Sequence, residues 1–352
     1  MKFIHCADIH LGSRMDSKFS REVSERKREE VRDTFHRMVE FAKEEGVRAI
    51  LLSGDVFDSD KPFKKDKEFF YSVVERNPEI DFVYLRGNHD KAGESRELSN
   101  LKTFGEEWTF FDYGEAVIAG IEMTPSNATS FYSTLSLEKA RFNIVMLHGQ
   151  VAAALGMDKI RLAGLRDKYV DYLALGHIHE YREEALDARG VYAYSGCLEG
   201  RGFDEIGEKG FLLLDVKDGA MTRTFCPVCS RVIEWIDLDV TGYGDAYAVY
   251  RLAADRIENR DSIYRFELVG ELDADVAELA SDVKKYLERE CFFVDVKDKT
   301  RRRIDLSAYE ADLSLAGEFV RLVYASEEYS DEEKEQIASL GIRALNGIEV
   351  DV

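Results

Sequence analysis

The sequence has few cysteines and no long run of apolar residues. Five cysteines lie scattered along 352 residues, and this odd, dispersed set argues against a disulfide framework and for a reducing compartment. The apolar runs are about four to seven residues long, far short of the roughly 18 that a membrane-spanning helix needs. The start of the chain also lacks the basic and then apolar layout of a secretory signal. We therefore expect a cytoplasmic protein without a membrane segment.

Positive charge is scarce as well. The chain carries 48 Lys and Arg against 69 Asp and Glu, a formal net charge of −21. Proteins that bind nucleic acids usually carry a basic surface, which this chain as a whole lacks. Three explanations stay open: the substrate is not a long polyanion, cations and local basic clusters attract it, or a partner supplies the basic surface. Solvated helix faces are the simpler explanation of the clusters, which are Arg14, Lys18 and Arg21, residues 26–28, and Lys61, Lys64, Lys65 and Lys67.

The pattern of apolar residues predicts an α/β fold. The chain has room for about two domains, and its 45% of hydrophobic residues allow a sizeable core. Apolar positions at helical spacing predict helices over residues 20–45 and 64–76. Between the helices lie short apolar runs without alternation, which indicate sheets buried on both faces. The predicted strands cover residues 3–6, 49–52, 82–85, 116–119, 144–147, 172–175, 191–194 and 210–216.

The chain changes in character near residue 231. The segment that follows contains no histidine and resembles a smaller α/β domain. Its predicted elements are helices over residues 247–257 and 276–287 and strands over residues 262–268 and 292–296. A helical pattern then runs from residue 313 to 345. The predicted domains are therefore residues 1–230, 231–310 and 311–352.

Five of the apolar runs end in polar motifs. Because the carboxyl ends of strands in such sheets open into ligand-binding loops, we expect the motifs to converge on one site. On an extended chain, residues i and i+2 point to the same side, so Asp8 and His10 can present two ligand atoms in one direction, as can His177 and His179. The motifs are Asp8-Ile9-His10, Gly54-Asp55-Val56-Phe57-Asp58, Gly87-Asn88-His89-Asp90, His148-Gly149 and Gly176-His177-Ile178-His179.

The side chains of these motifs form a candidate set of metal ligands. Asn88 and His89 are adjacent and should point apart, so one can bind a metal while the other faces a substrate. Seven mixed imidazole, carboxylate and amide donors are too many for one structural zinc ion and suit two ions that share a carboxylate. Two such ions about 3.5 to 4 Å apart can clamp a phosphoryl group and lower the pKa of a water molecule between them. The candidates are Asp8, His10, Asp55, Asn88, His148, His177 and His179.

Taken together and in this order, the five motifs resemble the signature of the calcineurin-like metallophosphoesterases, over residues 5–180. The start of the chain from Phe3 to Gly12 and the stretch from Tyr194 to Glu205 resemble, more narrowly, the SbcD group of DNA repair nucleases, which includes YhaO-type relatives. The resemblance implies an α/β fold in which a β-sandwich is flanked by helices in αββα layers. It also implies a smaller C-terminal α/β cap domain that selects substrates, followed by a helical tail.

The same resemblance implies a role for each ligand. It assigns one metal ion to Asp8, His10, Asp55 and His179, and the other to Asp55, Asn88, His148 and His177. His89 matches the catalytic histidine, which protonates the leaving oxygen or stabilises its charge, and Asp90 would orient that imidazole. Nitrogen and oxygen donors suit Mn²⁺, Fe²⁺, Zn²⁺ or Co²⁺, and the family likeness favours Mn²⁺. Some relatives carry a histidine where this chain has Asp58, so that histidine's role is not carried over.

The implied activity is that of a DNA nuclease with two metal ions, a 3′ to 5′ exonuclease that could also act as a single-strand endonuclease. It would process DNA breaks or ends with an SbcC-like SMC-type ATPase, which the helical tail would bind unless the tail only packs as core. Self-association into a homodimer stays open. One alternative is a phosphoesterase for a small or protein-borne phosphate, although the chain lacks the Asp-Arg-Gly of protein phosphatases. Another is a non-catalytic scaffold of a repair ATPase complex, against which the intact His89 speaks.

Three further features have plainer interpretations. Cys226-Pro227-Val228-Cys229 is a lone CxxC without a second pair or a spare histidine nearby, so an inert pair is favoured over a zinc or redox role. His5 lies in a predicted strand and His36 on the first predicted helix, so both are expected to be structural or surface groups. Ser195-Gly196 either places backbone donors near the substrate phosphate or forms a plain turn.

Overall fold

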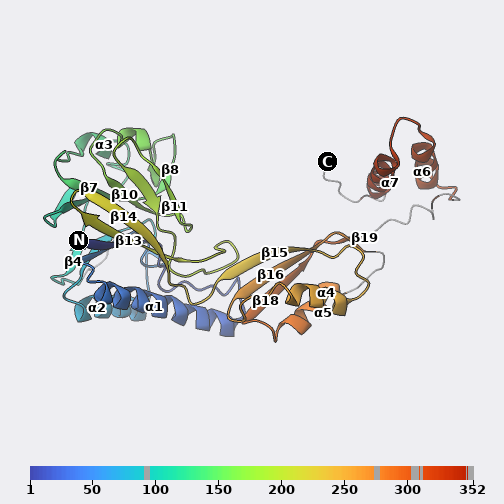
Figure 1. Cartoon of the computed structure of the whole chain (residues 1–352), viewed down its shortest axis with the longest axis horizontal. Coiled ribbons are helices and arrows are strands. Elements are labelled where there is room, and N and C mark those ends of the chain that lie inside the picture. Colours follow the sequence, from blue (N-terminus) through green and yellow to red (C-terminus); the bar gives the residue numbers. More distant parts are fainter. Residues whose placement is uncertain (91–95, 273–277, 303–308, 310–311, 346, 348–352) are drawn as a thin grey trace. The chain divides into compact units, whose positions relative to one another are not determined.

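The computed structural model describes residues 1–90, 96–272, 278–302, 309, 312–345 and 347 (Figure 1). The chain divides into two compact units. The first unit consists of Met1–Trp235 with Asp261–Tyr264, and the second of Ile236–Arg260 with Arg265–Val352. The predicted boundary between cap and tail, at residues 310 and 311, lies outside the described residues. A cap and a tail that form separate domains therefore remain a prediction.

The first unit contains a six-stranded sheet in the order β14-β13-β1-β2-β3-β4. Its parallel part consists of β1 (Lys2–Cys6), β2 (Ala49–Ser53), β3 (Asp81–Leu85) and β4 (Leu101–Thr103). The sheet is extended in the antiparallel sense by β13 (Gly210–Lys217) and β14 (Ala220–Pro227). Because β1, β2 and β3 are parallel neighbours, the three polar motifs that follow them emerge at one edge of the sheet.

A second six-stranded sheet has the order β11-β12-β10-β7-β6-β5. Its parallel part consists of β6 (Ala116–Gly120), β7 (Phe142–His148), β10 (Tyr172–Gly176) and β12 (Val191–Tyr194). The outer antiparallel strands are β5 (Thr109–Asp112) and β11 (Arg182–Ala185). A small separate pair is formed by β8 (Gln150–Val151) and β9 (Lys159–Ile160). The two remaining motifs follow β7 and β10, which are also neighbours.

The two sheets pack face to face around one apolar core. Phe3 and Leu51 from the first sheet share a buried cluster with Ile144, Met146 and Tyr172 from the second. All five side chains are fully buried. The predicted β-sandwich is confirmed, and each predicted strand of this unit is present to within two residues at either end.

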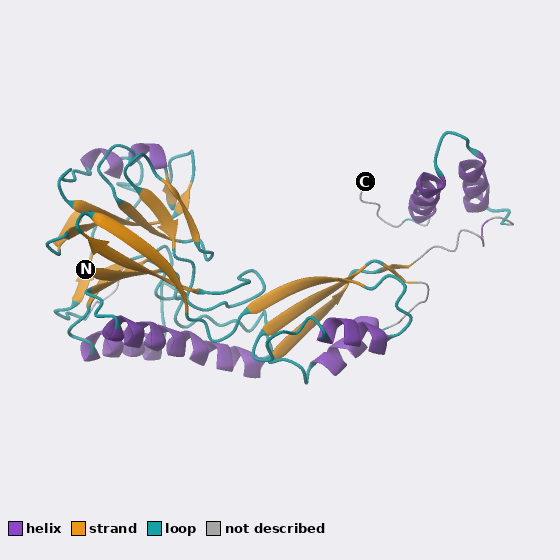
Figure 2. Cartoon of the chain, viewed as in Figure 1, coloured by secondary structure: helices purple, strands orange, loops and turns teal. Residues whose placement is uncertain are grey.

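Helices cover both outer faces of the sandwich, but unequally (Figure 1). On one face lie α1 (Arg21–Glu44) and α2 (Lys64–Arg76), where the Phe41 ring lies 5.2 Å from that of Phe211 on β13. The other face carries only the single turn α3 (Phe131–Thr134) and the 3₁₀ turn Leu162–Gly164, which pack on a second apolar cluster (Figure 2). The predicted αββα layers are therefore present, with one helical layer reduced to short turns.

The second unit is a smaller α/β assembly. Its three-stranded sheet has the order β15-β16-β18. The strands are β15 (Ile233–Asp239), which begins in the first unit, β16 (Ile263–Val269) and β18 (Phe293–Asp298). The helices are α4 (Ala246–Ala254) and α5 (Leu279–Leu287), and a short pair is formed by β17 (Glu271–Leu272) and β19 (Arg301–Arg302). The predicted start of the second helix, at residue 276, lies outside the described residues.

The predicted helical tail consists of two helices, α6 (Leu315–Ala325) and α7 (Asp331–Leu345). The break between them has a local cause. The Ser330 hydroxyl accepts a hydrogen bond from the Glu333 N–H while Glu333 accepts one from the Ser330 N–H, which is a capping box that starts a new helix. Val320 of α6 and Ile342 of α7 belong to one apolar cluster. Within the described residues, no helix is both long and apolar enough to cross a membrane.

Candidate metal centre

The loops after β1 and β2 hold unusual backbone conformations. Asp8, His10 and Asp55 have φ angles of 52°, 52° and 51°, in the left-handed region that few non-glycine residues adopt. The N–H of Asp8 donates to the Gly54 carbonyl and that of His10 to the Asp55 carbonyl, both at 3.0 Å. The predicted extended geometry of Asp8 and His10 is therefore wrong. Their side chains converge because the two loops are hydrogen-bonded to each other.

Asp8, His10 and His179 form the first group of donors. Nε2 of His10 and Nε2 of His179 lie 3.2 Å apart. Nε2 of His179 lies 3.9 Å from Oδ1 of Asp8. The backbone N–H of His177 donates to the Asp8 carboxylate at 2.9 Å, which fixes the orientation of that carboxylate. A ligand atom from each member lies within 4.8 Å of the others.

Asn88, His148 and His177 form the second group. Oδ1 of Asn88 lies 2.9 Å from Nε2 of His148 and 3.3 Å from Nδ1 of His177. The three side chains come from different strand ends, β3, β7 and β10, and so from both sheets. The structure thus brings together Asn88 and His177, which the sequence places 89 positions apart.

Asp55 lies between the two groups. Its Oδ2 is 3.4 Å from Nε2 of His148 and 3.9 Å from Nε2 of His10. Its Oδ1 accepts a hydrogen bond from the backbone N–H of His89 at 2.9 Å. Oδ2 therefore faces ligands of both groups, as a shared carboxylate must.

The outer ring nitrogens of three histidines are held by acceptors. Nδ1 of His148 lies 2.9 Å from the backbone carbonyl oxygen of Ser53. Nδ1 of His10 lies 3.1 Å from Oδ1 of Asp58, and Nδ1 of His179 lies 2.8 Å from Oε1 of Glu205. An acceptor at Nδ1 leaves Nε2 free as the ligand atom and fixes the plane of the ring. All three Nε2 atoms point into the centre described above.

The charges of the centre are coupled through burial. Burial raises the pKa of Asp8 to about 6 and lowers the pKa of His10 to about 4. Burial would also lower the pKa of His148, but hydrogen bonding to Asp55 and the charge of Asp8 outweigh it and raise that pKa to about 9. Carboxylates held this close to neutral imidazoles favour a bound cation in place of a proton.

The residues present fit two divalent metal ions. The donors are imidazole nitrogens, carboxylates and one amide oxygen, which suit borderline and hard divalent ions. Two nitrogens bound to one ion at about 2.0–2.1 Å lie roughly 3 Å apart, close to the 3.2 Å between the His10 and His179 nitrogens. Metal-ligand sets within the described residues are Asp8, His10 and His179, and Asp8, Asp55 and His148.

Two glycines leave room for the centre. A Cβ atom on Gly54 would lie 2.1 Å from Nδ1 of His148, and Gly54 has a φ of +95°. A Cβ atom on Gly87 would lie 2.2 Å from Oδ1 of Asp55. Glycine is therefore required at both positions by close approach, and at Gly54 also by the backbone angle.

The predicted partnership of His89 and Asp90 is only half present. The His89 side chain is exposed beside the centre, and its Nδ1 lies 3.2 Å from the backbone carbonyl oxygen of Asp58. Asp90 is buried, and its carboxylate accepts hydrogen bonds from the backbone N–H groups of Val56 at 3.0 Å and Phe57 at 2.9 Å. Asp90 therefore ties the β3 loop to the β2 loop, and the support expected for the imidazole is wrong.

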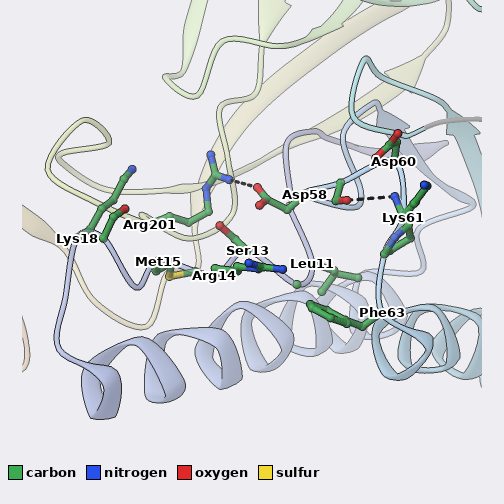
Figure 3. Close-up of a pocket in the computed structure, with 14 residues that line it drawn as sticks. Leu11, Ser13, Arg14, Met15, Lys18, Asp58, Asp60, Lys61, Phe63 and Arg201 are labelled. Carbon is green, nitrogen blue, oxygen red and sulfur yellow. Dashed lines mark hydrogen bonds and ion pairs between the residues drawn. The ribbon is translucent and has the colours of Figure 1, made fainter.

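Two supporting residues escape the motif analysis. Glu205 and Arg201 form an ion pair, and Glu205 contacts His179. Both lie in the Tyr194–Glu205 stretch that resembles the SbcD group, but nothing in that stretch indicates which side chain they serve. Arg201 and Asp58 also line a cavity of about 550 Å³ together with Arg14, Lys18 and Lys61 (Figure 3).

The remaining candidates lie outside the centre. Cys226 and Cys229 are free thiols whose pKa values are raised by burial, which fits an inert pair. His5 is buried in β1 against Tyr172, and His36 is exposed on α1. The structural and surface roles expected of these histidines are confirmed.

Comparisons with known proteins agree with this geometry. The model of the family described as calcineurin-like phosphoesterase matches residues 1–181. An uncharacterized metallophosphoesterase, YhaO of Bacillus subtilis (strain 168), is 30% identical over 275 residues, which are 72% of this chain and 67% of that protein. The DNA double-strand break repair protein Mre11 of Sulfolobus acidocaldarius is 25% identical over 263 residues, which are 68% of this chain and 67% of that protein.

The chain belongs to the calcineurin-like phosphoesterase family, and it is a metal-dependent phosphoesterase. Within this family it has homologues among DNA repair proteins. Besides Mre11, these include a subunit of the nuclease SbcCD from Rhodobacter capsulatus, which is 26% identical over 292 residues, 63% of this chain and 68% of that protein.

Proposed function

We propose that this protein is a DNA nuclease of the SbcD type, a 3′ to 5′ exonuclease with single-strand endonuclease activity as an extension, which processes DNA breaks or ends. The observation that supports it most is the position of Asp55, between two donor groups and bonded to the loop of the exposed His89. The names of the Mre11 and SbcCD relatives support DNA as the substrate.

The side chains divide the work of hydrolysis. Two bound metal ions, for which we favour Mn²⁺, would polarise the phosphodiester and lower the pKa of the attacking water. His89 stands exposed next to the His10 ring, with ring centroids 5.3 Å apart. From there its imidazole can give a proton to the leaving oxygen, which is the role of a general acid. Asp55 fixes the backbone from which His89 projects.

An acidic chain needs local or external help to hold DNA. The first unit offers a local solution, since Arg14, Lys18 and Lys61 line the cavity that adjoins Asp58. A partner offers the other, and we propose an SbcC-like SMC-type ATPase bound through α6 and α7, with a homodimer as a further state of assembly. The five cysteines are all free, which fits action in the reducing cytoplasm.

A phosphoesterase for a small or protein-borne phosphate is the second candidate. The net charge of −21 favours it, because surface charges of one sign repel a long polyanion within a Debye length of about 8 Å. A non-catalytic scaffold has less support, because the donor set and His89 are complete.

A panel of substrates separates these functions. Metal-free protein is loaded with Mn²⁺ and incubated with linear duplex DNA, single-stranded DNA, hairpin DNA, a chromogenic phosphodiester and a phosphopeptide. We expect cleavage of DNA, with the Asp55→Asn variant as an inactive control. Turnover of the small diester or the phosphopeptide with intact DNA, alone and with the ATPase partner, would favour the second candidate.

A further inference from the structure

Arg201 joins two carboxylates at the edge of the metal centre. Its Nη1 donates to Oδ1 of Asp58 at 2.9 Å, as Figure 3 shows, and its Nε donates to Oε2 of Glu205 at 3.2 Å. Its Nη2 donates to Oε1 of Glu205 at 2.5 Å and lies 3.1 Å from Nδ1 of His179. The guanidinium group is thus engaged on both sides, and its side chain is only 10% exposed.

Each of the two carboxylates supports one histidine of the first donor group. Oδ1 of Asp58, the atom that Arg201 contacts, lies 3.1 Å from Nδ1 of His10. Oε1 of Glu205 lies 2.8 Å from Nδ1 of His179. The Nε2 atoms on the far sides of these two rings are the pair that lie 3.2 Å apart. One guanidinium group therefore fixes two carboxylates, and the carboxylates fix two imidazoles.

The second donor group is supported in a different way. His148 has its Nδ1 against the backbone carbonyl of Ser53 at 2.9 Å. Its ligand partner Asn88 lies on the loop that Asp90 ties to the backbone of Val56 and Phe57. These supports are main-chain groups of the sandwich, and none of them is a contact of Arg201.

We infer that Arg201 is a positioning residue for one of the two metal positions, the one formed by the first donor group. Without the guanidinium group, Asp58 and Glu205 lose the partner that holds their carboxylates in place, so His10 and His179 lose their fixed ring planes. The position formed by Asn88, His148 and His177 keeps its supports. This inference rests on the two-metal centre of the proposed function, but it does not depend on DNA as the substrate.

The cavity makes a substitution at this residue feasible. Arg201 and Asp58 both line the cavity of about 550 Å³ that also contains Arg14 and Lys61 (Figure 3). A shorter side chain at this wall opens space that water can fill, because the cavity is polar and roomy. We therefore expect Arg201→Gln to fold, and circular dichroism and thermal melting of the metal-free protein would verify this.

The test is a metal titration of the whole chain. Metal-free wild-type protein and Arg201→Gln are titrated with Mn²⁺ by calorimetry and with Co²⁺ by electronic absorption, which reports on histidine ligation. We expect two ions per chain in the wild type. In Arg201→Gln we expect one ion at wild-type affinity and the other about 10–100-fold weaker, the usual effect of losing a group that orients a ligand. Arg201→Lys, which can keep one carboxylate contact, should be intermediate.

A matched control comes from another arginine of the same unit. Arg223 on β14 pairs with Glu183 on β11 at 2.8 Å, and Arg223→Gln should bind two ions with wild-type affinity. Two unchanged sites in Arg201→Gln, or an equal loss at both, would overturn the inference. If Arg201→Gln does not fold, Asp58→Asn decides in the same titration, because it too must weaken one position alone. A wild type that binds two ions but cuts no DNA would contradict the proposed function and leave this inference standing.

Discussion

Oδ1 of Asp55 accepts a hydrogen bond from the backbone N–H of His89 at 2.9 Å. The carboxylate that faces both donor groups therefore also fixes the loop that carries the proposed acid. Charge at the centre and the position of the imidazole are coupled through this one residue. Substitutions on either side of this bond should have different effects, and the predictions below use that difference.

His89 can be removed without loss of the fold. Its side chain is exposed, and its ring nitrogen contacts only a backbone carbonyl among the described residues. We expect His89→Ala to keep its melting temperature and its metal content while phosphodiester cleavage falls about 10²–10⁴-fold, the usual contribution of a general acid. His36→Ala, which removes an exposed histidine on α1, is the control and should keep full activity. Equal activity of His89→Ala and wild type would contradict the assigned role.

Gly87 should not accept even a methyl group. A Cβ atom there would lie 2.2 Å from Oδ1 and 2.6 Å from the backbone nitrogen of Asp55. Gly87→Ala must therefore displace the shared carboxylate, at a cost of about 1–3 kcal/mol for overpacking. Metal content, measured by atomic emission, should fall. Gly105→Ala is the control, because a Cβ atom there has no neighbour within 4 Å. Full metal content in Gly87→Ala would refute this account of the loop.

Lys27 is a buried anchor for the loop after β12. Its Nζ lies 2.6 Å from Oε1 of Glu199 and 3.3 Å from Oε2 of Glu30, and its side chain is 0% exposed. Lys27→Ala leaves two buried carboxylates without their cation, which should lower the free energy of unfolding by about 3–5 kcal/mol. Chemical denaturation measures the loss. Lys43→Ala, which removes an ion pair with Glu40 at the surface, should leave the denaturation midpoint unchanged.

His5 should make the fold sensitive to acid. Its Nδ1 lies 2.8 Å from the Tyr172 hydroxyl and its Nε2 lies 3.1 Å from the Leu175 carbonyl oxygen. A neutral ring, with Nε2–H donating to the carbonyl, satisfies both contacts. Burial lowers the pKa of His5 from 6.5 to about 3. Below pH 6.5 the unfolded chain therefore takes up a proton that the folded protein refuses.

The consequence is a loss of stability that grows as the pH falls from 6.5 towards 3. Each pH unit in this window costs about 1.4 kcal/mol for such a group. In His5→Gln this contribution is absent, so the free energy of unfolding should fall less steeply between pH 6.5 and 4.5 than in the wild type. Denaturation at several pH values compares the two slopes. Parallel slopes would show that His5 is protonated in the folded protein.

The convergence of the ligands could be predicted because parallel strands end at a common edge. Asp8, Asp55 and Asn88 follow three neighbouring strands of one sheet, and His148 and His177 follow neighbouring strands of the other. Neither the facing of the two sheets nor the left-handed backbone at Asp8 is marked in the sequence. The backbone there depends on hydrogen bonds to a loop that lies more than 40 residues away.

Partners distant in the sequence could not be predicted. Residues 26–28 have a composition typical of a solvated helix face, yet Lys27 is buried because Glu199, 172 residues later, folds over it. The pairing of Glu205 with His179 depends in the same way on a loop whose course has no local signal. Adjacency in the sequence suggests that Asp90 supports His89, whereas its acceptor oxygens serve the backbone of another loop.

The most direct test of the central claim is a cleavage assay with Mn²⁺-loaded protein on linear duplex DNA labelled at the 5′ end. We expect a ladder of labelled products that shorten from the 3′ end. The ladder should vanish when the metal is chelated and in His89→Ala. Intact DNA in the presence of Mn²⁺ and the ATPase partner, with a small phosphodiester hydrolysed under the same conditions, would contradict the claim.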